Sequence, residues 1–209
     1  MVRKAFNLIL LCVLTLVTTV SWAEDAPTDL RFRFAGSSIF AVPTGYARST
    51  ASYINDDGES SLFITQSLGE ILEVSLQRRL SGDYKNENTI NGKLVLLCEG
   101  RIIPGMTFGV TDVGKKLGDR IYYLAASKNL EDFGLTLTAG VYRDPVDKDK
   151  ITFFGVEKVI LPLISVAAER VDDVNTYGIK LTPYPGLSLD VAQRDGKEEM
   201  YNLVYTTRY

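Results

Sequence analysis

The sequence predicts an all-β protein, a single antiparallel transmembrane β-barrel of about twelve strands that follows an N-terminal signal peptide. Three observations predict it. Apolar and polar residues alternate with a period of two through most of the chain, as half-buried strands require. A long apolar run occurs only near the start, and the chain ends on a tyrosine that continues an alternating pattern. Uncertain strand boundaries leave about ten to fourteen strands open.

The first residues have the layout of a secretory signal peptide. Arg3 and Lys4 give a positive start, and residues 5–20 form an apolar run without a charge. Ser21-Trp22-Ala23 then places small residues at positions −3 and −1 of a cleavage site. The apolar run is short for a spanning helix, and an uncleaved anchor is the alternative.

This layout divides the chain into three parts. We expect a signal peptide over residues 1–23, a periplasmic lead-in segment over residues 24–45 and the barrel over residues 46–209. The expected location is the outer membrane of a Gram-negative cell envelope, reached through export and cleavage of the signal peptide.

The composition excludes several kinds of chemistry. The chain contains no histidine, which excludes a Ser-His-Asp triad and removes the usual zinc and copper ligand sets. Cys12 lies in the signal peptide, so Cys98 has no partner for an intramolecular disulfide. Acidic residues outnumber basic ones by 26 to 23, which does not suit nucleic-acid binding. We expect no enzymatic activity, no metal and no cofactor.

The alternating segments are separated by glycine, proline, asparagine and aspartate. The clearest one sets Phe133, Leu135, Leu137, Ala139 and Val141 against Gly134, Thr136, Thr138 and Gly140. The two glycines indicate close backbone approach or curvature inside a narrow barrel. Expected strands cover residues 46–55, 60–67, 71–79, 89–99, 104–112, 119–128, 132–143, 151–159, 163–171, 173–182, 186–194 and 198–209.

The connections favour a barrel over a soluble sandwich, whose strands would show the same alternation with the apolar face inward. Connections after odd-numbered strands are mostly long and charged, whereas those after even-numbered strands are mostly short. Outer-membrane barrels have this asymmetry, with long loops outside and short periplasmic turns. The long set is 80–88, 113–118, 144–150 and 195–197, and the short set is 68–70, 129–131, 160–162 and 183–185.

The end of the chain resembles the insertion signal of outer-membrane barrels. One face of the last strand carries Tyr201, Leu203, Tyr205, Thr207 and Tyr209. An aromatic final residue would place its ring in lipid and its hydroxyl in water. The alternative is an ordinary edge strand of a soluble sheet. The signal implies the barrel-assembly machinery as a partner, with outer-membrane lipid and lipopolysaccharide around the barrel.

If the apolar faces contact lipid, the opposite faces line the lumen and carry the candidate site residues. Opposite charges there either pair across strands and fill a narrow barrel, which we favour, or line a narrow polar path. The expected lumen residues are Glu73, Gln77, Arg79, Lys93, Glu99, Glu157, Glu169, Lys180, Asp190 and Arg194.

Three motifs that suggest other chemistry fail in detail. Residues 109–116 approach a phosphate-binding loop, but Lys116 replaces the magnesium-binding hydroxyl and no helix follows. Ser127 and Lys128 are adjacent on a strand, so their side chains point to opposite faces and do not form a dyad. The acidic runs 56–59 and 144–149 lack the spacing of a calcium loop.

Several segments resemble the barrel repeat of the YjbH-type outer-membrane proteins. They are NGKLVLLCEG (91–100), PGMTFGVTD (104–112), YYLAASK (122–128), FGLT (133–136), AERVDDVNTYGI (168–179), PGLSLD (185–190) and VPT (42–44). The resemblance implies an outer-membrane barrel associated with exopolysaccharide production, and it carries no catalytic residues.

The resemblance favours one function among three. We expect an accessory role in export or assembly of a surface polysaccharide, with polysaccharide-export proteins as partners, or a structural role in the outer membrane. The alternatives are a narrow, porin-like solute channel and a soluble periplasmic β-sandwich that binds a ligand.

Overall fold

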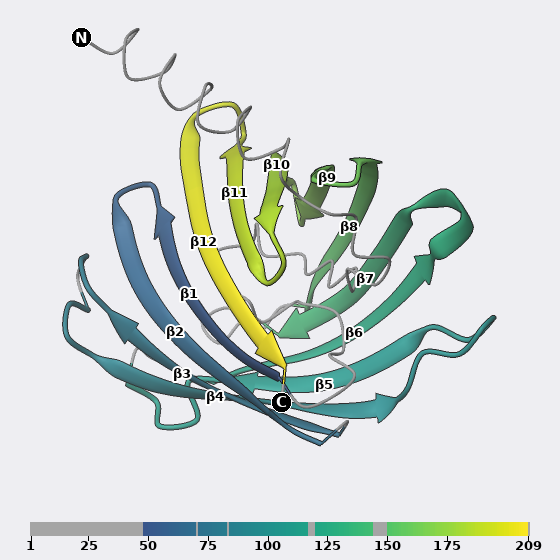
Figure 1. Cartoon of the computed structure of the whole chain (residues 1–209). Helices are drawn as coiled ribbons and strands as arrows, with labels where there is room; N and C mark the ends of the chain where they lie inside the picture. Colours follow the sequence, from purple (N-terminus) through teal and green to yellow (C-terminus); the bar gives the residue numbers. More distant parts are fainter. Residues whose placement is uncertain (1–47, 70, 83, 117–119, 144–149, 209) are drawn as a thin grey trace, which may run out of the picture.

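The protein is a closed twelve-stranded antiparallel β-barrel (Figure 1). The computed structural model describes residues 48–208 except 70, 83, 117–119 and 144–149. The expected signal peptide, the lead-in segment and Tyr209 lie outside the described residues. The strands are β1 (Arg48–Asp56), β2 (Glu59–Leu68), β3 (Leu72–Arg79), β4 (Asn88–Leu97), β5 (Gly105–Thr111), β6 (Ile121–Leu130), β7 (Leu135–Arg143), β8 (Lys150–Leu161), β9 (Ile164–Val171), β10 (Val174–Tyr184), β11 (Leu187–Arg194) and β12 (Glu198–Arg208).

The first and last strands close the sheet. Each strand pairs with its neighbours in the chain, and β1 pairs with β12 in a register that runs from Arg48 opposite Arg208 to Asp56 opposite Met200. Figure 1 shows β12, in yellow, beside β1, in blue. Closure gives the described strands partners on both sides, so the sheet has no free edge. The predicted barrel of about twelve strands is therefore confirmed.

The apolar faces of the strands point outward. Leu137 is 43% exposed and Tyr205 is 52% exposed, whereas the inward side chains of Thr107 and Glu157 are 0% and 1% exposed. Residues on one strand alternate between these two environments because successive side chains point to opposite faces of a sheet. The expected alternative of a two-sheet sandwich with an apolar interior is wrong for this chain, because one sheet closes on itself around a mainly polar interior.

The structure corrects the start of the seventh strand. Glu131–Phe133 forms a 3₁₀ turn that Gly134 ends in the left-handed conformation, with φ of 54°. The strand therefore begins at Leu135. Phe133 and Gly134 continue the alternation in sequence, but Gly134 serves the turn. A residue with a Cβ would be strained at that φ.

Gly140, by contrast, lies where the predicted close approach occurs. It pairs with Phe153 of β8, and the Phe153 ring covers it so closely that a Cβ would collide with the ring and with the Leu124 carbonyl. Gly109 has the same relation to the ring of its cross-strand neighbour Tyr123. The inward rings of Tyr123 and Phe153 thus lie against the barrel wall, directly over Gly109 and Gly140, where any side chain would collide with them.

One connection departs from the expected asymmetry of the loops. A bulge between Val95 and Leu97 ends β4 at Leu97, and β5 begins only at Gly105. The long connection 98–104 therefore lies at the end of the barrel where the other turns are short. At the opposite end, Asp57 and Gly58 join β1 to β2 with positive φ values of 46° and 88°, as two-residue hairpin turns prefer.

Candidate functional site

The inner face of β3–β6 carries a row of residues in direct register. Glu73 is opposite Lys93, Lys93 is opposite Gly109, and Gly109 is opposite Tyr123. The Lys93 Nζ lies 2.8 Å from Glu73 Oε1, and both side chains are more than nine-tenths buried. In such a buried pair each charge compensates the other. The sheet register alone brings these two groups together.

A second buried ion pair lies on the wall formed by β8–β11. Lys180 of β10 places its Nζ 3.3 Å from Glu157 Oε1 of β8, reaching past β9. Ser165 of β9 donates a hydrogen bond of 2.6 Å to the same carboxylate oxygen. Lys180 is itself opposite Ser165 in the ladder. Glu157 therefore has one charged and one neutral donor, and its side chain is almost completely buried.

Two more carboxylates face inward on this wall. Asp190 of β11 is opposite Lys180 and is 2% exposed, and Asn202 of β12 donates a 2.9 Å hydrogen bond to its Oδ2. Glu169 of β9 is opposite Thr176 and is also buried. Among the described residues, the inner face of β8–β11 between the barrel ends has three carboxylates and one ammonium.

The inner face of β5–β7 has a different character. Among the described inward residues of these strands none is a carboxylate, lysine or arginine; hydroxyl groups and small side chains dominate. Thr107, Ser127 and Thr138 are buried, and their side-chain oxygens have no hydrogen-bond partner. Ser127 is directly opposite Thr138. This sector therefore carries buried hydroxyl groups and no buried charge among its described inward residues.

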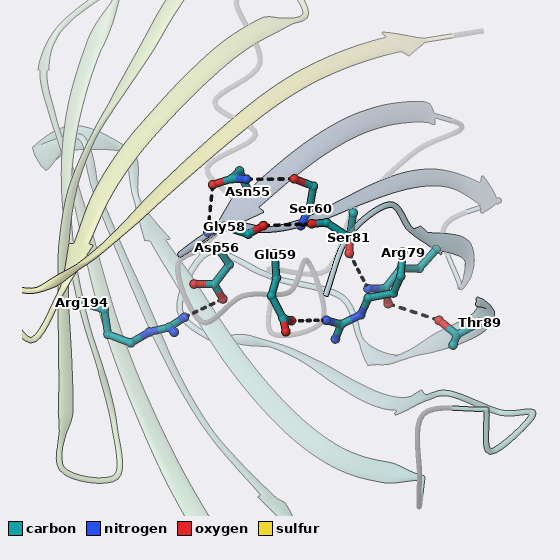
Figure 2. Close-up of polar contacts among 11 residues, drawn as sticks. Asn55, Asp56, Gly58, Glu59, Ser60, Arg79, Ser81, Thr89 and Arg194 are labelled. Atoms are coloured by element: carbon teal, nitrogen blue, oxygen red, sulfur yellow. Dashed lines mark hydrogen bonds and ion pairs between the residues drawn. The ribbon is translucent and has the colours of Figure 1, made fainter. Parts of the chain in front are cut away.

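Ion pairs also join the strands at the end of the barrel near the β1–β2 hairpin (Figure 2). Arg194 contacts Asp56 and Glu198, with Nη2–Oδ2 and Nη1–Oε2 distances of 3.0 Å each. Arg79 contacts Glu59, with an Nη1–Oε2 distance of 2.6 Å. We call these residues the mouth network. Their side chains are partly exposed, as groups at an opening would be.

Hydroxyl groups hold the hairpin inside the mouth network. Ser81 donates a hydrogen bond of 2.9 Å to the Gly58 carbonyl and accepts one of 2.7 Å from the Ser60 backbone N–H. Asn55 donates to the Ser60 hydroxyl over 2.9 Å. Figure 2 shows these contacts between the two arginines. The β3–β4 connection, through Ser81, thereby anchors the β1–β2 turn and the two carboxylates that flank it.

Gln77 and Glu99, the remaining expected lumen residues, lie on the inner face of β3 and in the loop after β4. Gln77 is buried on the inner face of β3, where it donates to Ser61 and accepts from Thr89, both over 3.2 Å. Glu99 lies in the loop after β4 instead of on a strand, because the bulge ends that strand early. Its carboxylate contacts Lys128 Nζ at 2.7 Å outside the ladder.

The residues expected to form the insertion signal are on the outside of β12 where the structure describes them. Tyr201, Leu203 and Tyr205 are 42%, 47% and 52% exposed. Thr207 is also exposed. They form an outward apolar and aromatic face near the seam with β1.

Sequence reasoning missed several members of the inner surface. Asp56, Glu59 and Glu198 of the mouth network were not expected, nor were Tyr123 and Phe153. A signal for the first two exists in the sequence, since Asp57-Gly58 is a favoured two-residue hairpin turn. The residues that flank such a turn are paired at the strand ends, as Asp56 and Glu59 are. The two rings gave no local signal, because their glycines lie on neighbouring strands.

The described residues give little support to a metal site or a Ser-Lys dyad. No three of their histidine, cysteine, aspartate or glutamate side chains form a group that could hold a metal ion. Ser127 points inward, whereas Lys128 bonds to Glu99 and the Gly100 carbonyl. In the same part of the chain, no helix has the length and apolar character needed to cross a membrane.

A groove of about 690 Å³ runs across β8–β12 on the outer side of the barrel. Tyr177, Ile179 and Tyr201, all exposed, stand along it. These side chains point away from the interior, because inward and outward positions alternate along each strand. The groove is therefore separate from the charged inner wall.

Comparisons with known proteins agree with the architecture. No protein-family model and no curated protein matches the chain in sequence. The solved structure of the KdgM porin in complex with disordered oligogalacturonate matches with a TM-score of 0.55 at 12% identity, over 78% of this chain and 99% of that chain. A structure of the KdgM porin alone matches with a TM-score of 0.54 at 9% identity and the same coverage. This chain therefore shares the closed β-barrel fold of those structures.

Proposed function

We propose that the protein is an outer-membrane barrel that passes small polar solutes through a narrow lumen. The observation that carries the proposal is the distribution of polarity across the wall. Most exposed large side chains around the outside of the barrel are leucine, isoleucine, valine or aromatic, while the buried inner side chains are mostly charged, hydroxyl or amide groups, with a few apolar ones such as Phe63 and Phe153. In water the outer surface would be a large apolar patch of the kind that soluble monomers avoid. In a bilayer the same surface is solvated by acyl chains.

The loops support one orientation in the membrane. The connections after β3, β5 and β7 are long and lie at the end that holds the mouth network. Long loops face the outside in outer-membrane barrels, and short turns face the periplasm. In this orientation the mouth network lies at the outer opening, and the start of β1 and the end of β12 lie at the periplasmic side.

The inner surface supports a channel for small solutes. Conduction through a barrel needs polar groups along the path, and β5–β7 provide hydroxyls while β3–β4 and β8–β11 provide paired charges. Most inward side chains are less than one-tenth exposed. Any path is therefore narrow and suits small solutes. The similarity in fold to the KdgM porin supports the same proposal.

Location and conductance test the proposal in turn. The full chain is expressed with its leader, and the outer-membrane fraction is run on a gel before and after boiling. A folded barrel is expected to migrate faster before boiling. The purified protein is then placed in a planar bilayer, where step conductances are expected. A silent bilayer would overturn the channel and leave the barrel standing, whereas recovery of the protein in the soluble periplasm would overturn both.

Adjacent residues of β7 provide a matched pair of variants. Thr138 is inward and buried, whereas Leu137 is outward and 43% exposed. Thr138→Trp is expected to lower the conductance several-fold by filling the path, whereas Leu137→Trp is expected to leave it unchanged. The gel shift checks that each variant is folded. Equal conductances for the two variants would contradict a path through the barrel.

A second proposal is an accessory role in exopolysaccharide export or assembly. Its support is the resemblance to the YjbH-type barrel repeat, whose segments 104–112 and 122–128 contribute to the paired strands β5 and β6. Deletion of the gene is expected to reduce surface polysaccharide, and the wild-type gene should restore it. An unchanged polysaccharide would reject this role. The proposed surroundings are outer-membrane lipid and lipopolysaccharide, with the barrel-assembly machinery and export proteins as partners.

A further inference from the structure

Large apolar side chains are exposed at the turns on the end of the barrel opposite the mouth network. They are 54–87% exposed and belong to Ile71, Ile102, Ile103, Phe133, Leu161 and Tyr184, which we call the turn rim. Each of the five connections at this end contributes at least one of them. We infer that the turn rim is inserted in the interfacial region of a phospholipid leaflet and anchors this end of the barrel. The inference rests on the proposed outer-membrane location and orientation, and it does not depend on conduction.

The end of the barrel that holds the mouth network is more polar on its outside. Where the strands reach that end, their last outward side chains include Asn55, Arg78, Arg143, Arg170 and Gln193. The turns Asp57-Gly58 and Asp172-Asp173 have no apolar side chain. In the longer connections there, the described large apolar side chains that are exposed are Leu80, Tyr84 and Val113, and each is less than half exposed. The exposed apolar surface of the turns is therefore concentrated at the turn rim.

The most exposed member of the turn rim, Ile102, lies on a loop that hydrogen bonds hold in place. The Glu99 carboxylate accepts a hydrogen bond of 2.7 Å from Lys128 Nζ of β6, and the same ammonium donates to the Gly100 carbonyl over 2.9 Å. The Gly100 backbone N–H donates to the Ile103 carbonyl over 3.0 Å and closes a turn that presents Ile102 at its tip. An exposed apolar side chain that is fixed in this way indicates a surface that another apolar phase covers.

The turn rim continues the outward apolar face of the strands. Leu72 of β3 and Leu94 of β4 are opposite each other in the ladder, and both are exposed on the outside. The Val95 backbone N–H donates a hydrogen bond of 2.7 Å to the Ile71 carbonyl, so the β2–β3 turn lies directly beyond that pair. A lipid leaflet contacts a barrel around its circumference, whereas a protein partner covers one sector. Because the turn rim extends over the connections from β2 to β11, lipid is the occupant that fits.

Charged side chains in the same connections indicate the depth of insertion. Arg101, Glu131 and Asp132 are exposed beside the turn rim. Charges are costly at the bilayer midplane but are tolerated near the interface. Aromatic side chains such as Phe133 and Tyr184 also favour the level of the lipid headgroups. The turn rim therefore fits the boundary between headgroups and acyl chains, where charged groups can contact headgroups and water.

Tryptophan fluorescence tests the inference. The one tryptophan of the chain is Trp22, so the full chain with Trp22→Phe provides a background without tryptophan. Single tryptophans are added to it, and each protein is refolded into dioleoylphosphatidylcholine vesicles with or without bromine on the acyl chains. Ile102→Trp is expected to emit at shorter wavelength than in water and to lose about half of its intensity in the brominated vesicles. Leu137→Trp, in the middle of β7, is expected to lose at least as much.

Tyr84→Trp is the matched control, because Tyr84 is an exposed residue of the β3–β4 connection at the mouth end. It is expected to keep its intensity in brominated vesicles and to be quenched by iodide in the water. The gel shift checks folding, and Ile103→Trp takes the place of Ile102→Trp if that variant does not fold.

Three outcomes would contradict a different part of the proposal. Quenching of folded Ile102→Trp by iodide but not by brominated lipid would place the turn rim in water and overturn the inference. Protection from both quenchers would mean that protein, such as a second copy of the chain, covers the turn rim, and would overturn lipid as the occupant. Absence of lipid quenching at Leu137→Trp as well would overturn the membrane-spanning barrel itself.

Discussion

The Arg194 guanidinium of β11 reaches past β12 to the Asp56 carboxylate of β1, with an Nη2–Oδ2 distance of 3.0 Å. The same guanidinium holds Glu198 of β12. One side chain therefore connects three strands at the seam where the sheet closes. The seam joins the two ends of the strand sequence, so its closure has a large entropic cost that local turns do not offset.

The seam contacts predict a measurable loss of stability in Arg194→Gln. Both ion pairs would be lost, and a decrease of about 1 kcal/mol in unfolding free energy is expected, since the groups are only partly exposed. Urea unfolding of the detergent-solubilised barrel measures it. Arg170→Gln is the control, because the Arg170–Asp173 pair is 57% and 89% exposed and should contribute close to nothing. Equal effects in the two variants would show that Arg194 does not stabilise the seam.

The buried pair Glu73–Lys93 predicts strongly non-additive variants. Either Glu73→Gln or Lys93→Met alone leaves a buried charge without its ion-pair partner, and each is expected to cost about 3–5 kcal/mol. The double variant removes both charges and should be more stable than either single variant. Unfolding of all four proteins completes the double-mutant cycle. Additive effects would mean that the two groups do not interact energetically.

Gly140 predicts a position where a single methyl group is not tolerated. Its Cβ would collide with the Phe153 ring and the Leu124 carbonyl, so Gly140→Ala is expected to cost about 1–3 kcal/mol from overpacking. Gly92→Ala is the matched control, because the nearest atom to its Cβ is Val110 Cγ1 at an ordinary 3.7 Å. Adding Phe153→Leu to Gly140→Ala should recover only part of the loss, since the carbonyl remains. A loss as large in Gly92→Ala would point to strand flexibility instead of the ring contact.

The outward face predicts a depth-dependent cost of charge. Leu137 lies within β7, whereas Phe133 lies in the turn before it. Leu137→Arg is expected to cost about 2–4 kcal/mol in a bilayer, and Phe133→Arg about 0–1 kcal/mol near the interface. Refolding into lipid vesicles with urea titration measures both. Similar small costs at the two positions would contradict a membrane around this strand.

Most of the strands were predictable from sequence, because the alternation that marks a strand involves only residues close together in the chain. Alternation along 150–161 or 187–194 depends only on neighbouring residues, and the predicted strands agree with the observed ones within a few residues. The prediction was wrong at Phe133 and Gly134, where the alternation continues although the backbone turns. It also extended β4 too far, to Glu99. The bulge between Val95 and Leu97 depends on pairing with β5, and the sequence of β4 alone gives no sign of it.

The partners of the inner charges depend on register and barrel closure. Lys180 pairs with Glu157 two strands away and not with a sequence neighbour, and Arg194 meets Asp56 only because β12 lies against β1. The rings of Tyr123 and Phe153 lie over glycines of adjacent strands for the same reason. The sequence by itself determined which residues form strands and how their two faces differ, since a period of two is a property of the extended chain. Only the tertiary structure decided which face is enclosed and which charges meet there, since those outcomes depend on contacts between residues far apart in the chain.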